Sequence, residues 1–252
     1  MERIILLDAD IPVYKFAAAG QADANGDRLY EPYKHVVRKL DDSIEALGDQ
    51  MEATRIIVCL SSDPNWRKTV LPTYKGNRKD TEDPEYRAKL KQHLLDNYEC
   101  MQFPELEGDD VMGILATDPE FPGRKVIISE DKDMKTIPHR KHKQSANWLF
   151  NPAKDRKPRK VSEADADYFW MMQTLMGDST DGYTGIPGIG EKKAEKILGP
   201  VEEGHFDLWW DLVVDAYNNR DLTMEDAWVQ ATVARILRAE DYDQQKQERF
   251  PW

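Results

Sequence analysis

The sequence predicts an α/β fold with a mostly parallel central sheet, helices on both faces, and a helical C-terminal part. Short unbroken apolar runs at residues 4–7, 55–60 and 125–129 alternate with segments of helical spacing. Runs of this kind are typical of strands that are buried on both faces of a parallel sheet. Strands that alternate with helices form βαβ units. From residue 163 onward only helical patterns remain, so the C-terminal part should consist of helices.

Seven segments carry apolar residues at helical spacing. They are residues 36–51, 85–98, 109–117, 163–176, 191–198, 206–217 and 224–240. The first three lie between the predicted strands and should cover the sheet, and the last four should pack on one another. The basic segment 151–162 separates the two groups. We therefore predict an α/β core at residues 1–160 and a helical region at residues 161–252.

Composition excludes some classes of protein and leaves nucleic-acid binding open. The 252 residues are 40% hydrophobic and 33% charged, which is typical of a globular protein with a core. No apolar run approaches 18 residues and the start is too soon acidic for a signal peptide, so we expect a cytoplasmic protein without membrane contact. The net charge is −12, yet residues 67–79 and 140–160 are strongly basic, and Tyr74 interleaves with the first group of charges. Such local basic stretches are typical of nucleic-acid contact.

Three carboxylates fall within four positions of the segment LEGDDVMG, residues 106–113. An acidic residue at a helix start can accept backbone N–H groups, and this explains one or two of them. Each further charge raises the cost of ionising the others unless a cation is near. This segment alone leaves capping and metal binding both open.

The remaining acidic residues favour metal binding, because they follow strands. Asp8, Asp63, Asp131 and Asp133 each come after a predicted strand, and sites in open α/β sheets lie beyond the carboxyl ends of strands. The segment GDSTDG adds two more. The full set is Asp8, Asp63, Glu107, Asp109, Asp110, Asp131, Asp133, Asp178 and Asp181. Ligands that are all oxygen select Mg²⁺ or Mn²⁺, and this many acids suit two ions, the arrangement used for phosphodiester cleavage.

A glycine-rich turn, GIPGIG at residues 185–190, comes directly before a short basic helix. Glycines let the backbone approach an anion closely, and the amides at a helix N-terminus face it. Lys192, Lys193 and Lys196 add positive charge, which favours phosphate contact without recognition of base identity.

Together, the LDAD start, YKGNR, LEGDD, SEDKD and GDSTDGYTGIPGIG resemble the flap-endonuclease (5′-nuclease, PIN-like) superfamily. The stretches DPNWRK, LEGDDVMG and DKDMKTIP are most similar to the 5′→3′ exonucleases of short-tailed lytic bacteriophages. The motifs follow the order of the family along nearly the whole chain. The resemblance implies metal-dependent hydrolysis from the 5′ end of duplex DNA, with activity on flaps and RNA–DNA hybrids. Its role in a phage would be in DNA replication and recombination.

The resemblance also implies a role for each motif residue. Asp8, Asp63, Glu107, Asp109 and Asp110 would form a first metal site, and Asp131, Asp133, Asp178 and Asp181 a second. Lys75 and Arg78 of YKGNR would contact the scissile phosphate, so we take them with Asp109 and Asp110 as catalytic and with Tyr74 as DNA contacts. Gly185, Gly188 and Gly190 would form a helix–hairpin–helix element that grips the duplex backbone and holds a monovalent cation such as K⁺.

One departure from the family concerns the segment after YKGNR. Relatives that cleave flaps carry a long helical arch there, whereas here about twenty residues separate Lys79 from Glu99, enough for one helix and a short turn. We therefore expect exonuclease action to dominate over flap cutting.

Two alternatives explain part of the pattern. A haloacid-dehalogenase-type phosphatase also places Asp-x-Asp after its first strand, but here Ile11-Pro12 follows Asp10, and GDSTD follows a helix. A DNA-binding module without catalysis would account for the hairpin and the basic stretches. It would not account for the carboxylates, because a phosphate binder gains nothing from a cluster of negative charge facing its ligand.

Overall fold

The structure is a computed structural model that describes residues 1–20, 31–77, 83–202 and 204–250. Arg78, one of the predicted catalytic residues, lies outside the described residues. No helix within the described ranges is both long and apolar enough to cross a membrane.

The central sheet has five strands in the order β3-β2-β1-β4-β5, and every neighbouring pair is parallel. The strands are β1 (Arg3–Asp8), β2 (Arg55–Cys59), β3 (Cys100–Met101), β4 (Gly123–Ile128) and β5 (Ser145–Phe150). The three predicted strands and the parallel arrangement are confirmed. The sequence SANWLF of β5 was not predicted as a strand, because it contains no unbroken aliphatic run and lies inside the basic stretch 140–160.

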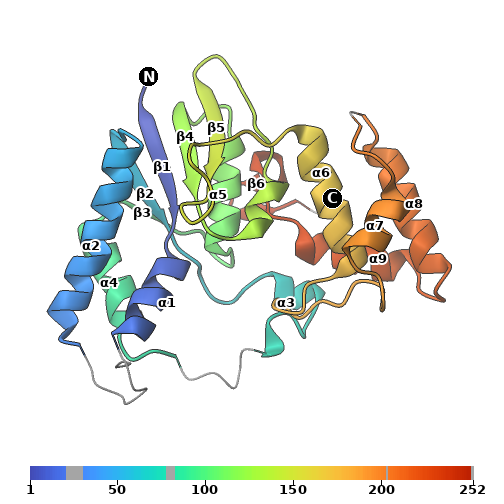
Figure 1. Ribbon diagram of the computed structural model, residues 1–252, viewed down its shortest axis with the longest axis horizontal. Coiled ribbons are helices and arrows are strands. Elements are labelled where there is room, and N and C mark those ends of the chain that lie inside the picture. Colours follow the sequence, from blue (N-terminus) through green and yellow to red (C-terminus); the bar gives the residue numbers. More distant parts are fainter. Residues whose placement is uncertain (21–30, 78–82, 203, 251–252) are drawn as a thin grey trace.

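Alternating side chains of the strands feed two separate hydrophobic clusters, one on each face of the sheet. On one face Ile4 and Leu6 of β1 pack with helix α5 (Gly108–Thr117). On the other face Ile5 and Leu7 pack with three helices. These are α1 (Asp10–Ala19), α2 (Tyr33–Gln50) and α4 (Arg87–Asn97), which Figure 1 shows beside the sheet. The predicted cover of both faces is confirmed, although α1 was not foreseen.

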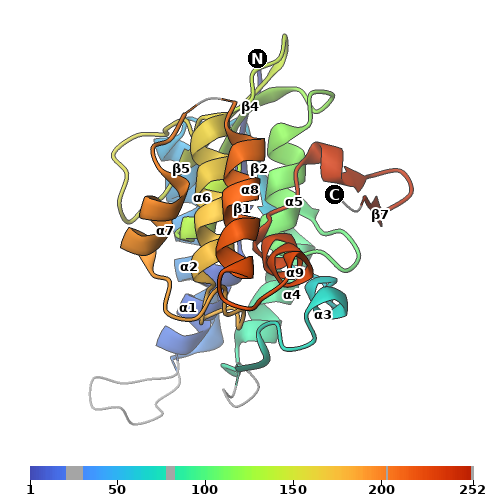
Figure 2. The ribbon, with the colours of Figure 1, turned by 90° about the vertical axis from the view of Figure 1, so that its right-hand side faces the viewer.

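The helical part of the chain forms a third hydrophobic cluster. Its helices are α6 (Glu163–Met176), α7 (Glu191–Leu198), α8 (Phe206–Asn218) and α9 (Met224–Ala234). Helix α6 packs against the other three (Figure 2). The first cluster also takes in side chains from 236–242, so this region packs onto the core as well. The boundary at residue 160 stays a prediction.

Helix α9 ends at Ala234 and not near residue 240 as its pattern suggested. The next four residues leave the helix because their backbone and side chains have buried partners elsewhere. The Leu237 amide donates to Asp110 Oδ1 at 3.1 Å, and the Arg235 guanidinium binds Asp241. Shorter elements complete the fold: α3 (Arg67–Val70), the 3₁₀ turns η2 (Lys132–Thr136) and η3 (Ala239–Asp241), and the hairpin β6 (Tyr242–Asp243) with β7 (Glu248–Arg249).

The order of the strands fixes where a site can form. The chain builds outward from β1 through β2 to β3, then returns to the other side of β1 to form β4 and β5. The connections therefore diverge between the carboxyl ends of β1 and β4, which leaves a crevice at this switch point. Asp8 is the last residue of β1, and Asp131 lies three residues beyond the end of β4.

Candidate active site

Asp8, Asp109 and Asp131 come together at this switch point. The Ser129 hydroxyl donates to Asp8 Oδ2 at 2.6 Å and accepts from the Asp131 amide at 3.0 Å, so it ties the ends of β1 and β4 together. Asp109 projects from the first turn of α5, and the charges of Asp8 and Asp131 act directly on it. The predicted convergence of carboxylates from separate strand and helix ends is confirmed for these three residues.

Burial and like charge both disfavour ionisation here. Burial raises the pKa of Asp8 to about 7, and the charges of Asp10 and Asp131 add to this effect against the Ser129 hydrogen bond. The pKa of Asp109 is also raised well above its usual value, first by burial and then by Asp8, Asp131 and Glu107. Carboxylates that stay opposed in this way are suited to a cation, which would relieve the repulsion.

The start of α5 is also a true helix cap, so the capping reading of LEGDDVMG holds for two of its three acids. Glu107 and Asp110 form a reciprocal capping box. Both Asp110 oxygens are taken by the Arg67 guanidinium, at 2.6 and 2.7 Å. Oδ2 also accepts from Trp66 Nε1 and Oδ1 from the Leu237 amide. Asp110 is completely buried and its oxygens are occupied by protein donors, which favours a structural role over its predicted roles as a metal ligand and a catalytic residue.

Glu107 is held by cations. Its burial would raise its pKa, but the charges of Arg67 and Lys75 outweigh burial and lower the pKa to about 2. Arg67 Nη1 lies 3.0 Å from Glu107 Oε2, and the Lys75 ammonium pairs with the other carboxylate oxygen. Glu107 therefore stays ionised and links the first carboxylate group to Lys75.

A second carboxylate group surrounds η2 and the loop after α6. It contains Asp133, Asp178 and Asp181. Burial raises the pKa of Asp133 to about 7, and the charges of Asp131, Asp181 and Asp178 raise it against the opposing charge of Lys132. Lys132 Nζ lies 2.6 Å from Asp178 Oδ2. Asp131 acts on Asp8 and Asp109 as well as on Asp133, so the two predicted metal groups meet through this residue.

The YKGNR segment closes the site from the side of α3. Lys75 has a positive φ of 52°, and its amide donates to the Asp181 carbonyl at 2.7 Å. Its ammonium lies 3.6 Å from Asp181 Oδ2. Burial opposes its charge, but Glu107, Asp181 and Asp109 raise the Lys75 pKa overall, so it remains a cation.

Tyr74 does not face solvent, which corrects its prediction as a DNA contact. Its side chain is only 3% exposed. The hydroxyl lies 3.0 Å from Glu107 Oε2 and 2.9 Å from Asp181 Oδ2, between the two carboxylate groups. Tyr74 therefore braces the site from within.

Asp63 is exposed after the end of β2, and its ligand role stays a prediction. In the described part of the chain no three acidic, histidine or cysteine side chains stand ready to enclose an ion. Lys75 pairs with a carboxylate oxygen of Glu107, and Lys132 pairs with one of Asp178. The donors are nonetheless carboxylate oxygens throughout, which fit a hard divalent cation.

Sequence patterns did not predict the side chains that hold these acids in place. Arg67 belongs to the basic stretch 67–79 that suggested nucleic-acid contact, yet it is buried and also donates to the Val233 and Arg235 carbonyls. Ser129 was not singled out. Two features of the sequence could have indicated these roles. Arg67 directly follows Trp66, and Ser129 lies between a predicted strand and an acidic turn.

The glycine-rich turn is divided in its exposure. Gly185 is buried, its amide donates to Gln230 Oε1 at 2.9 Å, and a Cβ there would meet the Gly177 amide. Its prediction as a phosphate contact is therefore corrected. Gly188 and Gly190 are exposed, and Lys193 Nζ donates to the Gly188 carbonyl at 2.7 Å. Lys192 and Lys196 are also exposed, on the helix that begins after Gly190.

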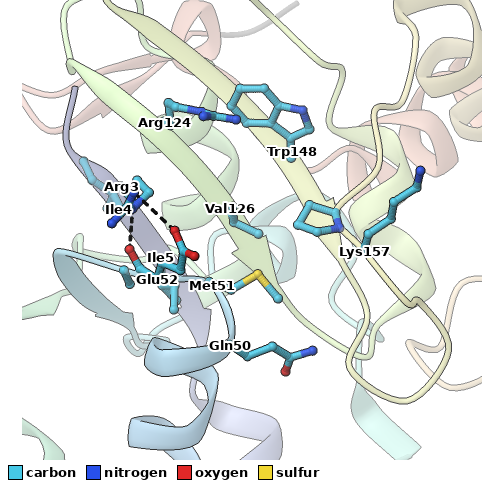
Figure 3. A pocket seen from close by; sticks show the side chains of 12 residues that line it. Arg3, Ile4, Ile5, Gln50, Met51, Glu52, Arg124, Val126, Trp148 and Lys157 are labelled. Atoms are coloured by element: carbon cyan, nitrogen blue, oxygen red, sulfur yellow. Dashed lines mark hydrogen bonds and ion pairs between the residues drawn. The ribbon is translucent and has the colours of Figure 1, made fainter.

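Two of the cavities among the described residues lie at opposite ends of the sheet. One, of about 440 Å³, lies by the amino ends of β1 and β4 (Figure 3). There the guanidinium carbon of Arg124 lies 5.0 Å from the ring centroid of Trp148, and Arg3 pairs with Glu52. None of the active-site carboxylates lines this cavity. The other, of about 710 Å³, is lined by Asp10, Tyr14, Lys15, Asp83, Arg87 and Thr180, among others, so it opens beside the active-site crevice.

The geometry removes the phosphatase alternative. Asp10, the second acid of the Asp-x-Asp pair, accepts from the Ser61 amide at 3.1 Å and from the Ser61 hydroxyl. The Gly108 amide in turn donates to the same hydroxyl at 2.9 Å. Asp10 therefore ties β1, β2 and α5 together and is not free to act as an acid or base beside Asp8.

A parallel α/β core whose strand ends carry an acidic centre flanked by a lysine defines a nuclease-like protein. The chain belongs to the 5′-3′ exonuclease family, because the model of its N-terminal resolvase-like domain matches residues 3–164. It is 31% identical to the exodeoxyribonuclease of Enterobacteria phage T3, over 99% of this chain and 92% of that protein. It is 30% identical to the exonuclease of Escherichia phage T7, over 99% and 93%.

The fold is also that of solved flap endonucleases. The bacteriophage T5 flap endonuclease, solved in a complex with DNA and metal ions, superimposes with a TM-score of 0.62 at 17% identity. The match covers 93% of this chain and 91% of that one.

Proposed function

We propose that the protein is a metal-dependent 5′→3′ exonuclease that hydrolyses phosphodiester bonds from the 5′ end of duplex DNA. The observation that carries this proposal is the meeting of Asp8, Asp109 and Asp131 at the switch point, where burial and like charge oppose the ionisation of Asp8 and Asp109. A network built only for stability would pair these charges, as Arg67 pairs Asp110. The exonuclease names of its phage relatives support the same activity.

Two divalent cations, Mg²⁺ with Mn²⁺ as a substitute, are the proposed cofactors. Asp8, Asp109 and Glu107 would hold the first, and Asp133, Asp178 and Asp181 the second, with Asp131 between them. When bound, such ions supply a nucleophile at neutral pH and stabilise charge on the attacking and leaving oxygens. The metal ions in the solved T5 complex support metal dependence.

Lys75 is the proposed electrostatic catalyst of the chain itself. Its ammonium pairs with Glu107 and lies near Asp181, so it stands between the two carboxylate groups. A cation fixed there by its backbone bond to Asp181 would stabilise the charge that develops on a phosphate. Arg78 remains its proposed partner at the phosphate.

The duplex would be gripped by the exposed hairpin. Gly188, Gly190 and the lysines of α7 present amides and positive charge, which suit the DNA backbone. We propose that this turn works as a helix–hairpin–helix element and holds a monovalent cation such as K⁺. The cavity of about 710 Å³ beside Asp10 and Tyr14 would receive the 5′-terminal nucleotide.

The resemblance of its motifs to the flap-endonuclease superfamily implies further substrates and a location. RNA–DNA hybrids and short flaps are proposed as further substrates, with exonuclease action dominant. The proposed location is the cytoplasm, that of the host cell for a phage protein.

Digestion of 5′-labelled duplex DNA tests the proposal. We expect label to be released in short products with Mg²⁺, and no release with a chelator or from the Asp109→Asn variant. Release from the 3′ end first would contradict the polarity. Duplex binding without cleavage under any divalent cation would favour the DNA-binding module instead.

A further inference from the structure

Two buried polar atoms beside the second carboxylate group have no hydrogen-bond partner among the described residues. One is the side-chain oxygen Oε1 of Gln173, a residue of α6 that is 1% exposed. The other is the hydroxyl of Tyr183, which is 3% exposed. Buried polar groups are nearly always bonded, so two unpartnered atoms at one place call for an explanation.

Gln173 acts directly on the site. Its amide nitrogen donates to Asp133 Oδ1 at 2.6 Å. The bond comes from the interior side of α6, so Asp133 is aimed by a side chain that solvent does not reach. Lys132, by contrast, approaches Asp133 from an exposed position at 3.6 Å.

Tyr183 is fixed at the base of the loop that carries Asp178 and Asp181. Its backbone exchanges two hydrogen bonds with Asp178, at 2.8 and 3.1 Å, and closes the loop as an antiparallel bridge. The carboxylates whose charges act on its hydroxyl are Asp133, Asp178 and Asp181. The phenol O–H is thus a buried donor that has no partner among the described residues and faces these acceptors.

We propose that Gln173 and Tyr183 are positioning residues of the second metal group. Gln173 orients Asp133, and the Tyr183 hydroxyl donates to the carboxylates once a divalent cation draws Asp133, Asp178 and Asp181 together. The inference rests on the proposed function, because it assigns these side chains to the metal group proposed there. Partners of this kind fix the orientation and the basicity of ligating carboxylates.

The test measures metal binding as well as activity. Removal of such a partner commonly weakens metal binding by about 10- to 100-fold. We expect Tyr183→Phe and Gln173→Met to raise the Mg²⁺ concentration for half-maximal cleavage, and the dissociation constant of Mg²⁺ by calorimetry, by about that factor. The KM for DNA should remain unchanged, because neither side chain reaches the surface.

Tyr242→Phe is the matched control. Tyr242 is 4% exposed, its hydroxyl likewise has no partner within the described residues, and its ring stacks on Phe103 in the first hydrophobic cluster. Its variant should bind Mg²⁺ like the wild type. Equal Mg²⁺ binding by Tyr183→Phe and wild type would overturn the inference and leave the proposed function intact. If the wild type itself bound no Mg²⁺, the proposed function would fail, and the inference with it.

Discussion

The guanidinium of Arg67 and the carboxylate of Asp110 form a two-point ion pair, with N–O distances of 2.6 and 2.7 Å, that solvent does not reach. Asp110 belongs to the acidic segment LEGDDVMG, whose composition suggests metal binding, yet its partner is the side chain of an arginine. The pair also anchors the end of α9, because Arg67 donates to the Val233 and Arg235 carbonyls.

Arg67→Ala should therefore destabilise the fold. The variant leaves the Asp110 charge buried without its partner, and breaking such a pair costs about 3–5 kcal/mol. Chemical denaturation with urea would measure the free energy of unfolding. Arg38→Ala is the control, since Arg38 pairs with Asp42 on an exposed surface and should contribute less than about 1 kcal/mol. Equal losses in the two variants would contradict the structural role of Arg67.

Asp109 and Asp110 should respond in opposite ways to replacement by Asn. Asp109→Asn removes a repelling charge, so the metal-free protein should keep or gain stability while cleavage is lost. Wild type should gain about 2.7 kcal/mol of stability at a hundredfold excess of Mg²⁺ over its dissociation constant, and this gain should shrink in Asp109→Asn. Asp110→Asn should lose stability and keep the gain. Thermal unfolding across a Mg²⁺ series at constant ionic strength distinguishes them, and a full gain in Asp109→Asn would refute its ligand role.

The metal-free protein should become more stable as the pH falls from 8 to 5. Asp8 and Asp133 have folded pKa values of about 7, above the unfolded value of about 3.9. A raised pKa contributes stability that is present below the unfolded value and lost as the pH rises through the folded value. Glu107 affects stability in the opposite direction, because its folded pKa is lowered to about 2. The stability that it contributes is lost only as the pH falls toward that value, below the range tested. Thermal midpoints in chelator would show the trend, which should be weaker in Asp8→Asn; an equal trend in both proteins would rule out Asp8 as a source.

Lys75→Met should lower turnover more than it changes the KM for DNA. Loss of one preorganised group that stabilises transition-state charge typically costs about 10²- to 10³-fold in kcat. Lys68→Met is the control, because Lys68 is an exposed residue of the same basic stretch. Single-turnover cleavage of labelled duplex would separate the two constants. A rise in KM alone would place Lys75 in binding and not in catalysis.

The hairpin lysines should govern the salt dependence of duplex binding. Replacing Lys192 and Lys193 with Ala should reduce the slope of log K against log salt by about 2 units, since each phosphate contact contributes about 0.9. Lys34 of α2 and Lys246 between β6 and β7 are exposed lysines outside the glycine-rich turn and α7, and their double variant should leave the slope unchanged. Fluorescence anisotropy with an uncleaved duplex in Ca²⁺ gives the slopes. Identical slopes in both variants would place the hairpin away from DNA.

Sequence patterns predicted the sheet and the convergence of acids because both depend on local residue type. Aliphatic runs marked β1, β2 and β4, and the acids after them had to share one edge of a parallel sheet. The strand β5 was not predicted, because a polar residue, Asn147, interrupts its apolar pattern. The Asn147 side chain is accommodated inside the fold by donating to the Pro138 carbonyl. Neighbouring acids such as Asp109 and Asp110 are alike in type. Only the packing of Arg67 separates the two, and that contact joins residues far apart in the chain.

The buried hydrogen bond between the Leu237 amide and Asp110 affects when the protein can fold during its synthesis. The two residues are 127 positions apart in the chain. At about 5–20 residues per second, the ribosome needs roughly 6–25 s to make that length after Asp110. Until then Asp110 lacks the amide of Leu237, and Arg67 lacks the carbonyls at the end of α9. The nascent chain therefore cannot complete the support beneath its acidic centre before the residues after α9 have been made, and a fragment that stops before Leu237 lacks that support.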